Sequence, residues 1–256
     1  MSIIPITKKI FLSSENSDNG TKKSVFSASI TGIISRHNNV LYSTIKLLHC
    51  EIPVSFYVIN EHNNRITINN INYVFDYGNY NANTFIVYFN NLTGLTLSIS
   101  TSTGKFKLTS ATSFTINNID STCQKIMGFD SDLVSVANEV VFSFPCNFIG
   151  TQNIVINSNN LIVDNYDTKH KNVTTIANIQ KNVSYYKTIY YTNMSNTAQH
   201  IKNIDLDKIE IELRDDNNKL IDFNNIDSFL TFEVIQYMKF FPNQNLDIEG
   251  EKDLKK

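Results

Sequence analysis

The run from residue 40 to residue 60, VLYSTIKLLHCEIPVSFYVIN, constrains the fold more than any other stretch of the chain. Its two alternating series are Leu41, Ser43, Ile45, Leu47 and His49 on one side, and Tyr42, Thr44, Lys46, Leu48 and Cys50 on the other. A period of two is typical of a half-buried β-strand. Pro53 interrupts the strand because it has no N–H to donate, and a β-type run resumes at 56–59. We therefore predict a long strand that bends at Pro53 and crosses between the layers of a two-sheet β protein.

The rest of the chain consists of further short strands separated by turns. They are expected at 25–35, 65–70, 71–77, 95–101, 105–111, 113–119, 140–148, 154–163, 172–179, 185–193, 208–215 and 229–237. One short helix is expected at 84–92, with Asn83 or Thr84 as its N-cap and Gly94 after its end. A second is expected in CQKIMGF, capped by 120–122 and ended by Gly128. The pattern predicts an all-β fold, a jelly-roll β-sandwich with one or two short helices.

Polarity along the chain predicts three regions. Residues 1–23 are expected to form an N-terminal arm. Ile3, Ile4, Ile6 and the KIFLS segment could make a short strand, but the following SSENSDNGTKK is polar and turn-rich. Residues 24–238 would form the jelly-roll β-sandwich, which can carry an inserted small β subdomain, and residues 239–256 a polar C-terminal tail. Polar turns or loops are expected at 36–39 and 164–171. Deletion of the arm is expected to weaken incorporation into a larger assembly without unfolding the domain.

Composition excludes several classes of partner and compartment. The formal net charge is −2 over 256 residues, so there is no basic footprint for nucleic acid or an anionic membrane. No apolar run approaches the ~18 residues of a membrane span, and the N-terminus has no signal-peptide pattern. The cysteines Cys50, Cys123 and Cys146 have neither disulfide-framework nor zinc spacing, which predicts buried free thiols in a chain folded in a reducing cytoplasm.

The sequence contains no catalytic, cofactor-binding or metal-binding motif. The histidines, His37, His49, His62, His170 and His200, show no metal-ligand spacing, and no nucleophile elbow or phosphate-binding glycine loop occurs. Glu210 and Glu212 lie two residues apart on one predicted strand face and could flank a glycosidic bond. A solvated strand face is the favoured interpretation of this pair. We therefore predict that the protein is not an enzyme and that it has no cofactor.

Two further stretches admit a binding interpretation. The turn at 215–218, DDNN, concentrates oxygen ligands but lacks the spaced pattern of a calcium loop, so a plain hairpin turn is favoured. Tyr185, Tyr186, Tyr190 and Tyr191 could stack on bases or sugars. Without surrounding Lys and Arg, we expect some of these tyrosines in the core and others at a subunit interface.

Several short motifs, in chain order, resemble the penton (vertex minor capsid) proteins of virophages, polinton-like viruses and related large DNA viruses of protists. IPVSFYVI at 52–59 is similar to the family's IPxSxYxI, and GNY at 78–80 with the following helix is similar to its GxY and short helix. CQKIMGF at 123–129 is similar to CxxxLGF, and residues 154–161 are similar to IxIxSxxL. The last motif, LRDDNN, IDFNN and FLTF between 213 and 232, is similar to LxDxxGxxIDxNGxxWxxTL. In the last motif Asn218 and Asn225 stand at the family's glycines, and Ser228 stands at its tryptophan. Asn keeps the turn chemistry, because it tolerates left-handed backbone.

The resemblance implies a jelly roll at the fivefold vertex of an icosahedral capsid. Five copies would form a ring, a homopentamer, that contacts the major capsid protein, and the protein would reside in the virion after assembly in the host cytoplasm. It implies a structural virion protein with no nucleic-acid partner and no membrane span. The alternative function is a carbohydrate-binding β-sandwich module used in host attachment, with exposed tyrosines as the sugar platform; a glycoside hydrolase is the third candidate.

Overall fold

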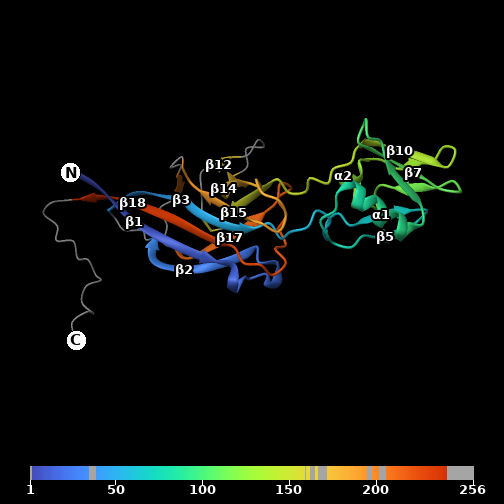
Figure 1. The fold of residues 1–256 in the computed structure, drawn as a ribbon. Helices are drawn as coiled ribbons and strands as arrows, with labels where there is room; N and C mark the ends of the chain where they lie inside the picture. Colours follow the sequence, from blue (N-terminus) through green and yellow to red (C-terminus); the bar gives the residue numbers. More distant parts are fainter. Residues whose placement is uncertain are drawn as a thin grey trace. The chain divides into compact units, whose positions relative to one another are not determined.

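A computed structural model describes residues 2–34, 39–158, 160–161, 165–166, 172–194, 198–201 and 206–240 (Figure 1). The chain divides into two compact units, and the second is inserted into the first. Unit 1 comprises Met1–Ser55 and Asn153–Lys256, and unit 2 comprises Phe56–Gln152. Each unit has its own buried core.

Unit 1 is built from antiparallel strands. The strands are β1 (Ser2–Ser13), β2 (Val25–Ile34), β3 (Val40–Pro53), β11 (Asn153–Asn157), β12 (Asn165–Tyr166), β13 (Asn172–Val173), β14 (Thr175–Gln180), β15 (Thr188–Thr192), β16 (Gln199–Ile201), β17 (Leu206–Arg214) and β18 (Phe229–Phe240). Two 3₁₀ turns, Ser14–Asn16 and Gly20–Lys22, connect β1 to β2. Apart from the β12–β13 pair, these strands form two sheets.

The strand order of the two sheets is that of a jelly roll. Sheet A has the order β1-β18-β3-β15, with β16 also paired to β3, and sheet B has the order β14-β11-β17-β2. If the eight strands on these two paths are numbered in chain order, sheet A is 1-8-3-6 and sheet B is 5-4-7-2. The first and last strands are thus neighbours in one sheet, and the second and seventh are neighbours in the other. This double-sheet arrangement confirms the predicted all-β jelly roll.

The core of unit 1 lies on the inner faces of its sheets. On β18, Leu230, Phe232 and Val234 are buried and alternate with more exposed residues. The register pairs Leu230 with Cys50 but Phe232 with Leu47, so β3 carries a bulge between them. The bulge places Cys50 on the same side as Leu47, because both pair with residues of one face of β18. The strict alternation predicted for this strand is therefore wrong beyond Leu47. It also fails at Leu41, because a second register shift pairs Tyr237 with Tyr42 but Met238 with Val40.

The prediction that β3 bends at Pro53 and continues is also wrong. The strand ends at Pro53, and of the residues 56–59 only Ile59 makes a β-bridge, to Gly78 of unit 2. At Ser55, hydrogen bonds from side chains replace the backbone hydrogen bonds of a strand. The Ser55 hydroxyl donates to the Phe223 carbonyl (2.6 Å), and Asn224 Nδ2 donates to the Ser55 carbonyl (2.6 Å). The proline thus marks the exit of the chain from the jelly roll rather than a crossing between its layers.

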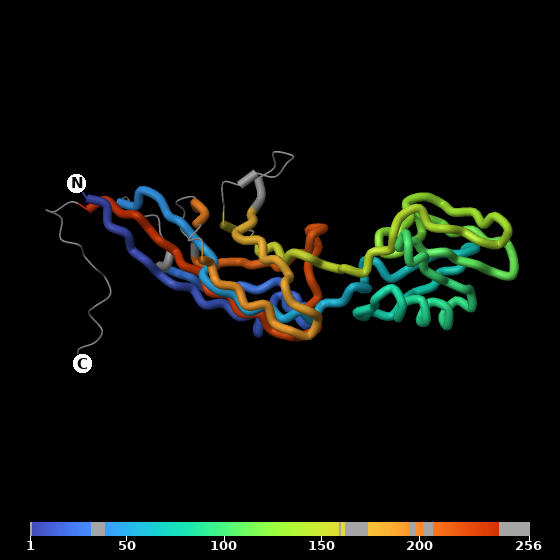
Figure 2. The backbone as a smooth tube through the Cα atoms, turned by 45° about the horizontal axis from the view of Figure 1, so that its top comes forward, coloured from blue at the N-terminus to red at the C-terminus, as the bar shows by residue number. Residues whose placement is uncertain are grey.

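The first half of the expected N-terminal arm is instead strand β1 of sheet A. All of β1 pairs with β18, from Ser2 opposite Phe240 to Ser13 opposite Phe229. The two strands run side by side in Figures 1 and 2, dark blue against red. Because β1 buries Ile10 and Leu12, deletion of residues 1–23 would expose an edge of β18 and remove core side chains. We now expect that deletion to destabilise unit 1, contrary to the sequence-based expectation.

The predicted tail and loops fall only partly on described residues. Strand β18 continues to Phe240, so residues 239 and 240 belong to the sheet rather than to a tail. The remaining tail, 241–256, lies outside the described residues. Residues 36–38 of the expected turn also lie outside the described residues. Of the expected loop at 164–171, only the strand residues Asn165 and Tyr166 are described.

Unit 2 contains two small sheets and two helices. Its elements are β4 (Arg65–Ile68), β5 (Ile71–Val74), α1 (Ala82–Thr93), β6 (Thr96–Ile99), β7 (Lys105–Thr109), β8 (Thr115–Asn117), α2 (Gln124–Met127), β9 (Leu133–Val134) and β10 (Glu139–Pro145). The sheet orders are β5-β4-β8-β9 and β10-β7-β6. Phenylalanines fill the core: Phe85 lies edge-on to Phe75 at 5.0 Å between ring centroids, and Phe106 lies edge-on to Phe142 at 6.3 Å.

Both predicted helices are present, but their N-caps differ from expectation. Helix α1 is capped by Asn81, whose side chain accepts the Thr84 N–H while Thr84 Oγ1 accepts the Asn81 N–H. Because of this reciprocal capping box, the N-cap is Asn81 and not the expected Asn83 or Thr84. Helix α2 starts after Cys123, without a side-chain cap from 120–122. The C-terminal glycines, Gly94 and Gly128, are as predicted.

Gly128 allows an unusually close backbone approach. Its φ is +90°, and a Cβ there would lie 2.2 Å from the Phe144 carbonyl oxygen. We predict that Gly128→Ala destabilises unit 2 by about 3 kcal/mol or more, because the left-handed penalty adds to a backbone clash. Gly94→Ala is the matched control, since Gly94 also has positive φ (+70°) but open space around its Cβ position. It should cost only about 1 kcal/mol. Equal losses in urea unfolding would contradict the role of the Phe144 contact.

Candidate functional surface

The most distinctive surface of unit 1 is the outer face of sheet A, which points away from the jelly-roll core. Because Leu230, Phe232 and Val234 point inward, the intervening residues of β18 point outward. The register then defines rows of outward side chains across the neighbouring strands. These rows are Ser13–Phe229–Glu51–Tyr190, Phe11–Thr231–His49–Thr192, Lys9–Glu233–Lys46, Thr7–Ile235–Thr44–His200 and Pro5–Tyr237–Tyr42.

Large aromatic side chains stand exposed on this face. Phe11 is 73% exposed, Tyr190 68% and Phe229 51%, on three different strands. At the other end of the face, Tyr42 stacks on Tyr237 with ring centroids 4.4 Å apart. An exposed apolar area of this kind on a folded unit typically marks an interaction surface, and aromatic residues are enriched in such interfaces.

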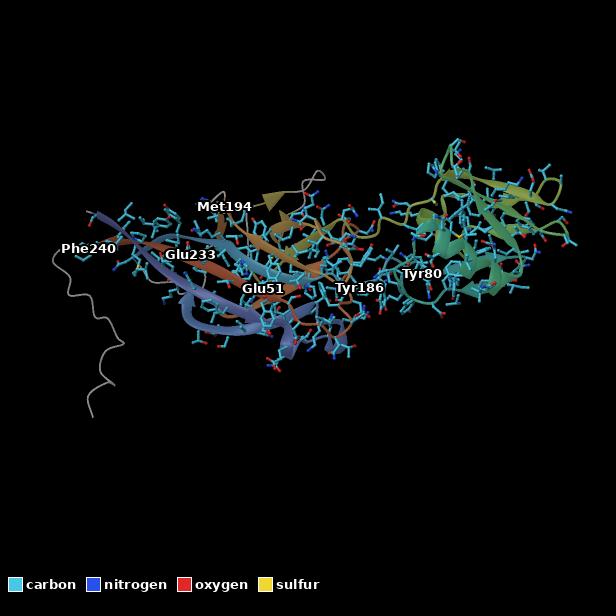
Figure 3. The ribbon with its side chains drawn as sticks, in the orientation of Figure 1. Glu51, Tyr80, Tyr186, Met194, Glu233 and Phe240 are labelled. Atoms are coloured by element: carbon cyan, nitrogen blue, oxygen red, sulfur yellow. The ribbon has the colours of Figure 1, made fainter. Side chains whose placement is uncertain are left out.

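An ion pair with little exposure to solvent lies at the centre of the same face. Lys46 Nζ lies 2.6 Å from Glu233 Oε2, and the two side chains are only 12% and 15% exposed. Figure 3 labels Glu233 on β18 and Glu51 on the neighbouring β3. Glu51 contacts His49 through Oε1 and Nε2 at 3.3 Å, and His49 Nδ1 lies 3.4 Å from the Thr192 hydroxyl. The face therefore combines exposed rings with fixed charges.

The shielding of the Lys46–Glu233 pair predicts a measurable effect on stability. Glu233→Gln should destabilise unit 1 by about 2 kcal/mol, because the Lys46 ammonium would lose the opposing Glu233 charge in a poorly solvated place. The Lys107–Glu139 pair of unit 2 is the matched control, with the same 2.6 Å distance but side chains 42% and 45% exposed. Glu139→Gln should cost about 0.5 kcal/mol. Denaturant unfolding with equal effects from the two changes would contradict this account.

Tyr186 is strained and exposed at the same time. Its φ is +66°, and its side chain is 80% exposed. Its N–H donates to the Val54 carbonyl (2.9 Å), while the Val54 N–H donates to the Lys187 carbonyl (2.8 Å). These bonds form a β-bulge whose left-handed first position usually holds glycine. A tyrosine here gains no burial within the described chain to offset its backbone strain, and strained residues of this kind cluster at functional sites.

We predict that Tyr186→Gly stabilises unit 1. Relief of the left-handed strain should add about 0.5–1 kcal/mol, which a rise in the unfolding temperature would report. Tyr190→Gly serves as the control, because Tyr190 pairs with Glu51 within a regular strand and its replacement should lower stability. A lower unfolding temperature for Tyr186→Gly would show that the tyrosine ring contributes to folding.

The four tyrosines singled out in the sequence do not share one surface. Tyr185 and Tyr186 precede β15, and Tyr191 is partly buried. Lys181 Nζ lies 3.2 Å from the Tyr185 hydroxyl and 4.3 Å from its ring centroid. Burial raises the pKa of Tyr185 and lowers that of Lys181. Tyr190 is the member that the strand places on the outer face of sheet A.

Phe11 and Phe229 were not singled out from the sequence. A usable signal was present in FLTF, where Phe229 and Phe232 have opposite parity, so one of them must face outward in a strand. Phe11 lies in KIFLS, which could make a short strand, but the segment was assigned to an arm, so neither face of that strand was predicted to be exposed.

The described histidines and the cysteines are not gathered into a site. His49, His62 and His200 are described, whereas His37 and His170 lie outside the described residues. No group of three His, Cys, Asp or Glu side chains among the described residues could hold a metal ion.

The thiols differ in burial. Cys50 and Cys123 are buried, and burial raises the pKa of both, to about 12 for Cys50. Cys146 is only partly buried, so the expectation of buried thiols is wrong for that residue.

The acidic candidates are already engaged within the fold. Glu212 is buried and accepts from Arg214 at 2.7 Å (Nε) and 2.6 Å (Nη2), so the predicted solvated strand face is wrong for it. Asp215 Oδ1 accepts the N–H groups of Asn217 and Lys219, which confirms the hairpin-turn interpretation. In the same region Asn218 and Asn225 both have φ of +62°, the conformation for which glycine or asparagine is suited.

No helix in the described part of the chain is long and apolar enough to span a membrane.

No family model and no curated protein matches the chain. Among solved structures, the chain is similar to the mavirus penton protein, with 13% sequence identity, a TM-score of 0.45 and coverage of 93% of this chain and 100% of that one. It is also similar to a chain of the Sputnik virophage cryo-EM structure, with 12% identity, a TM-score of 0.44 and coverage of 92% and 98%.

Proposed function

We propose that this protein is a structural component of a virion, a penton-type minor capsid protein that forms a homopentameric ring at an icosahedral vertex. The observation that carries the proposal is the jelly-roll strand order with an exposed aromatic face on sheet A. Double-sheet jelly rolls are used by viral capsid and lectin domains. An exposed face with Phe11, Phe229 and Tyr190 suits a protein whose function is contact with other subunits.

A ring requires two different surfaces on each copy, because the contacts between neighbours are heterologous. Sheet A supplies such a pair in its two opposite edges, and its outer face remains available to another protein. We propose that the major capsid protein is that second partner, that the protein is located in the virion after assembly in the host cytoplasm, and that it performs no catalysis.

The test is the oligomeric state of the full chain, alone and mixed with the major capsid protein. Sedimentation velocity should give a mass five times that of the chain, and negative-stain electron microscopy should show fivefold rings. A chain that stays monomeric at high concentration, both alone and with the major capsid protein, would overturn the proposal.

A second candidate function has one specific observation in its favour. The carboxylate of Glu51 lies in register between Tyr190 and Phe229, an arrangement of rings around a hydrogen-bonding group that could bind a sugar. Under this alternative, a carbohydrate-binding module for host attachment, a glycan array should show binding that Tyr190→Ala abolishes. If the intact chain binds no glycan on the array, the carbohydrate-binding alternative is excluded.

A further inference from the structure

Strand β1 presents a long free edge, with which no strand in the described part of the chain pairs. It is the terminal strand of sheet A and pairs with β18 over its whole length without a bulge. It also exposes large apolar side chains on both faces: Ile3 and Phe11 on the outer face, and Ile4 and Ile6 on the other. An edge that is long, regular and apolar is a template for pairing with another strand.

The hydrogen bonds show which backbone groups of β1 are available. The Ser14 N–H donates to the Ser228 carbonyl (3.0 Å), which continues the β1–β18 register by one pair. On the other side of β18, the Lys239 N–H donates to the Asn39 carbonyl (2.7 Å), so odd-numbered residues of β18 bond toward β3. Because hydrogen-bonded pairs alternate along an antiparallel ladder, even-numbered residues of β1 bond to β18. The N–H and C=O groups of its odd-numbered residues therefore point to the free edge.

Pro5 agrees with this assignment. It is odd-numbered, so the N–H that it lacks would have pointed to the free edge, and the ladder to β18 loses no bond. A proline is thus tolerated in β1 where it affects only pairing with a further strand.

Strand β15 lies at the opposite edge of sheet A, and no other described strand pairs with its outer side. The Asn193 N–H donates to the Leu48 carbonyl (2.9 Å), and the Val54 N–H donates to the Lys187 carbonyl. Odd-numbered residues of this segment therefore bond to β3, which leaves the backbone groups of Thr188, Tyr190 and Thr192 on the free edge. Tyr190 is also the most exposed aromatic residue of β15.

Strand directions make the two edges compatible. Each step from β1 to β18, β3 and β15 is antiparallel, so β1 and β15 run in opposite directions. A second copy in the same orientation can therefore place its β15 beside β1 and continue the antiparallel alternation. This contact joins two different edges, so it can repeat around a closed ring.

We infer that the free edge of β1 pairs with β15 of a neighbouring copy, so that sheet A becomes continuous from subunit to subunit. The occupant of the edge is a second copy of this chain, and the outer faces of the joined sheets bring Phe11 and Tyr190 of different copies to one surface. The inference deepens the proposed ring, on which it rests, by naming the strands that close it.

Proline substitutions at adjacent residues test the pairing. Lys9→Pro removes an N–H from the free edge of β1, whereas Lys8→Pro loses the same charge but removes an N–H from the ladder to β18. Tyr190→Pro and Tyr191→Pro form the equivalent pair on β15. Sedimentation velocity measures ring formation, and circular dichroism measures folding and thermal unfolding.

We expect Lys9→Pro and Tyr190→Pro to fold with the circular dichroism spectrum of the unmodified chain and to need at least tenfold higher concentration to form the ring. Lys8→Pro and Tyr191→Pro should unfold at clearly lower temperature. Rings that persist in both free-edge variants would overturn the edge pairing while leaving the ring itself established. Unfolding of Lys9→Pro to the same extent as Lys8→Pro would refute the assignment of the free edge. An unmodified chain that never forms a ring would refute the proposed function.

Discussion

The structure of unit 1 depends on the pairing of β18 along both of its edges. One edge binds β1 over that strand's full length, and the other binds β3. Through these ladders the last described strand of the chain holds its first strand and the strand that leads into unit 2. The inner side chains of the three strands, such as Ile10, Leu47 and Phe232, are buried together. The outer face can carry exposed rings because the core beneath it is complete.

Much of the fold could be predicted from local pattern. Strands such as β2 and β18 lie close to their predicted positions because a period of two survives in any half-buried strand. The turn Asn69-Asn70 between β4 and β5 has positive φ at both residues, which asparagine accommodates. The predictions that failed concern pairing between strands that are far apart in the sequence. Strand β1 was mistaken for an arm because its partner lies at the other end of the chain, and no local signal reveals such pairing.

The surface was harder to predict than the core. Alternation identifies two faces of a strand but does not say which face is covered. The bulge in β3 places Cys50 on the inner face and His49 on the outer face, the reverse of simple alternation from Leu47, and the bulge at Tyr186 interrupts the tyrosine-rich run before β15. Glu212 looked like a solvated residue, yet its pairing with Arg214 allows its burial. Tyr190 was anticipated as a possible contact residue, whereas Phe11 depended on recognising β1.

The pairing of β1 with β18 also sets the order in which the protein can fold during synthesis. Unit 2 is continuous in sequence from Phe56 to Gln152, so it can fold as soon as that segment has left the ribosome. Sheet A cannot be completed until Phe229–Phe240 emerges, and until then the edge of β1 that will bind β18 has no partner. The nascent chain must therefore keep this edge from pairing with other chains, and the charged side chains of Lys8 and Lys9 are of the kind that discourage premature association.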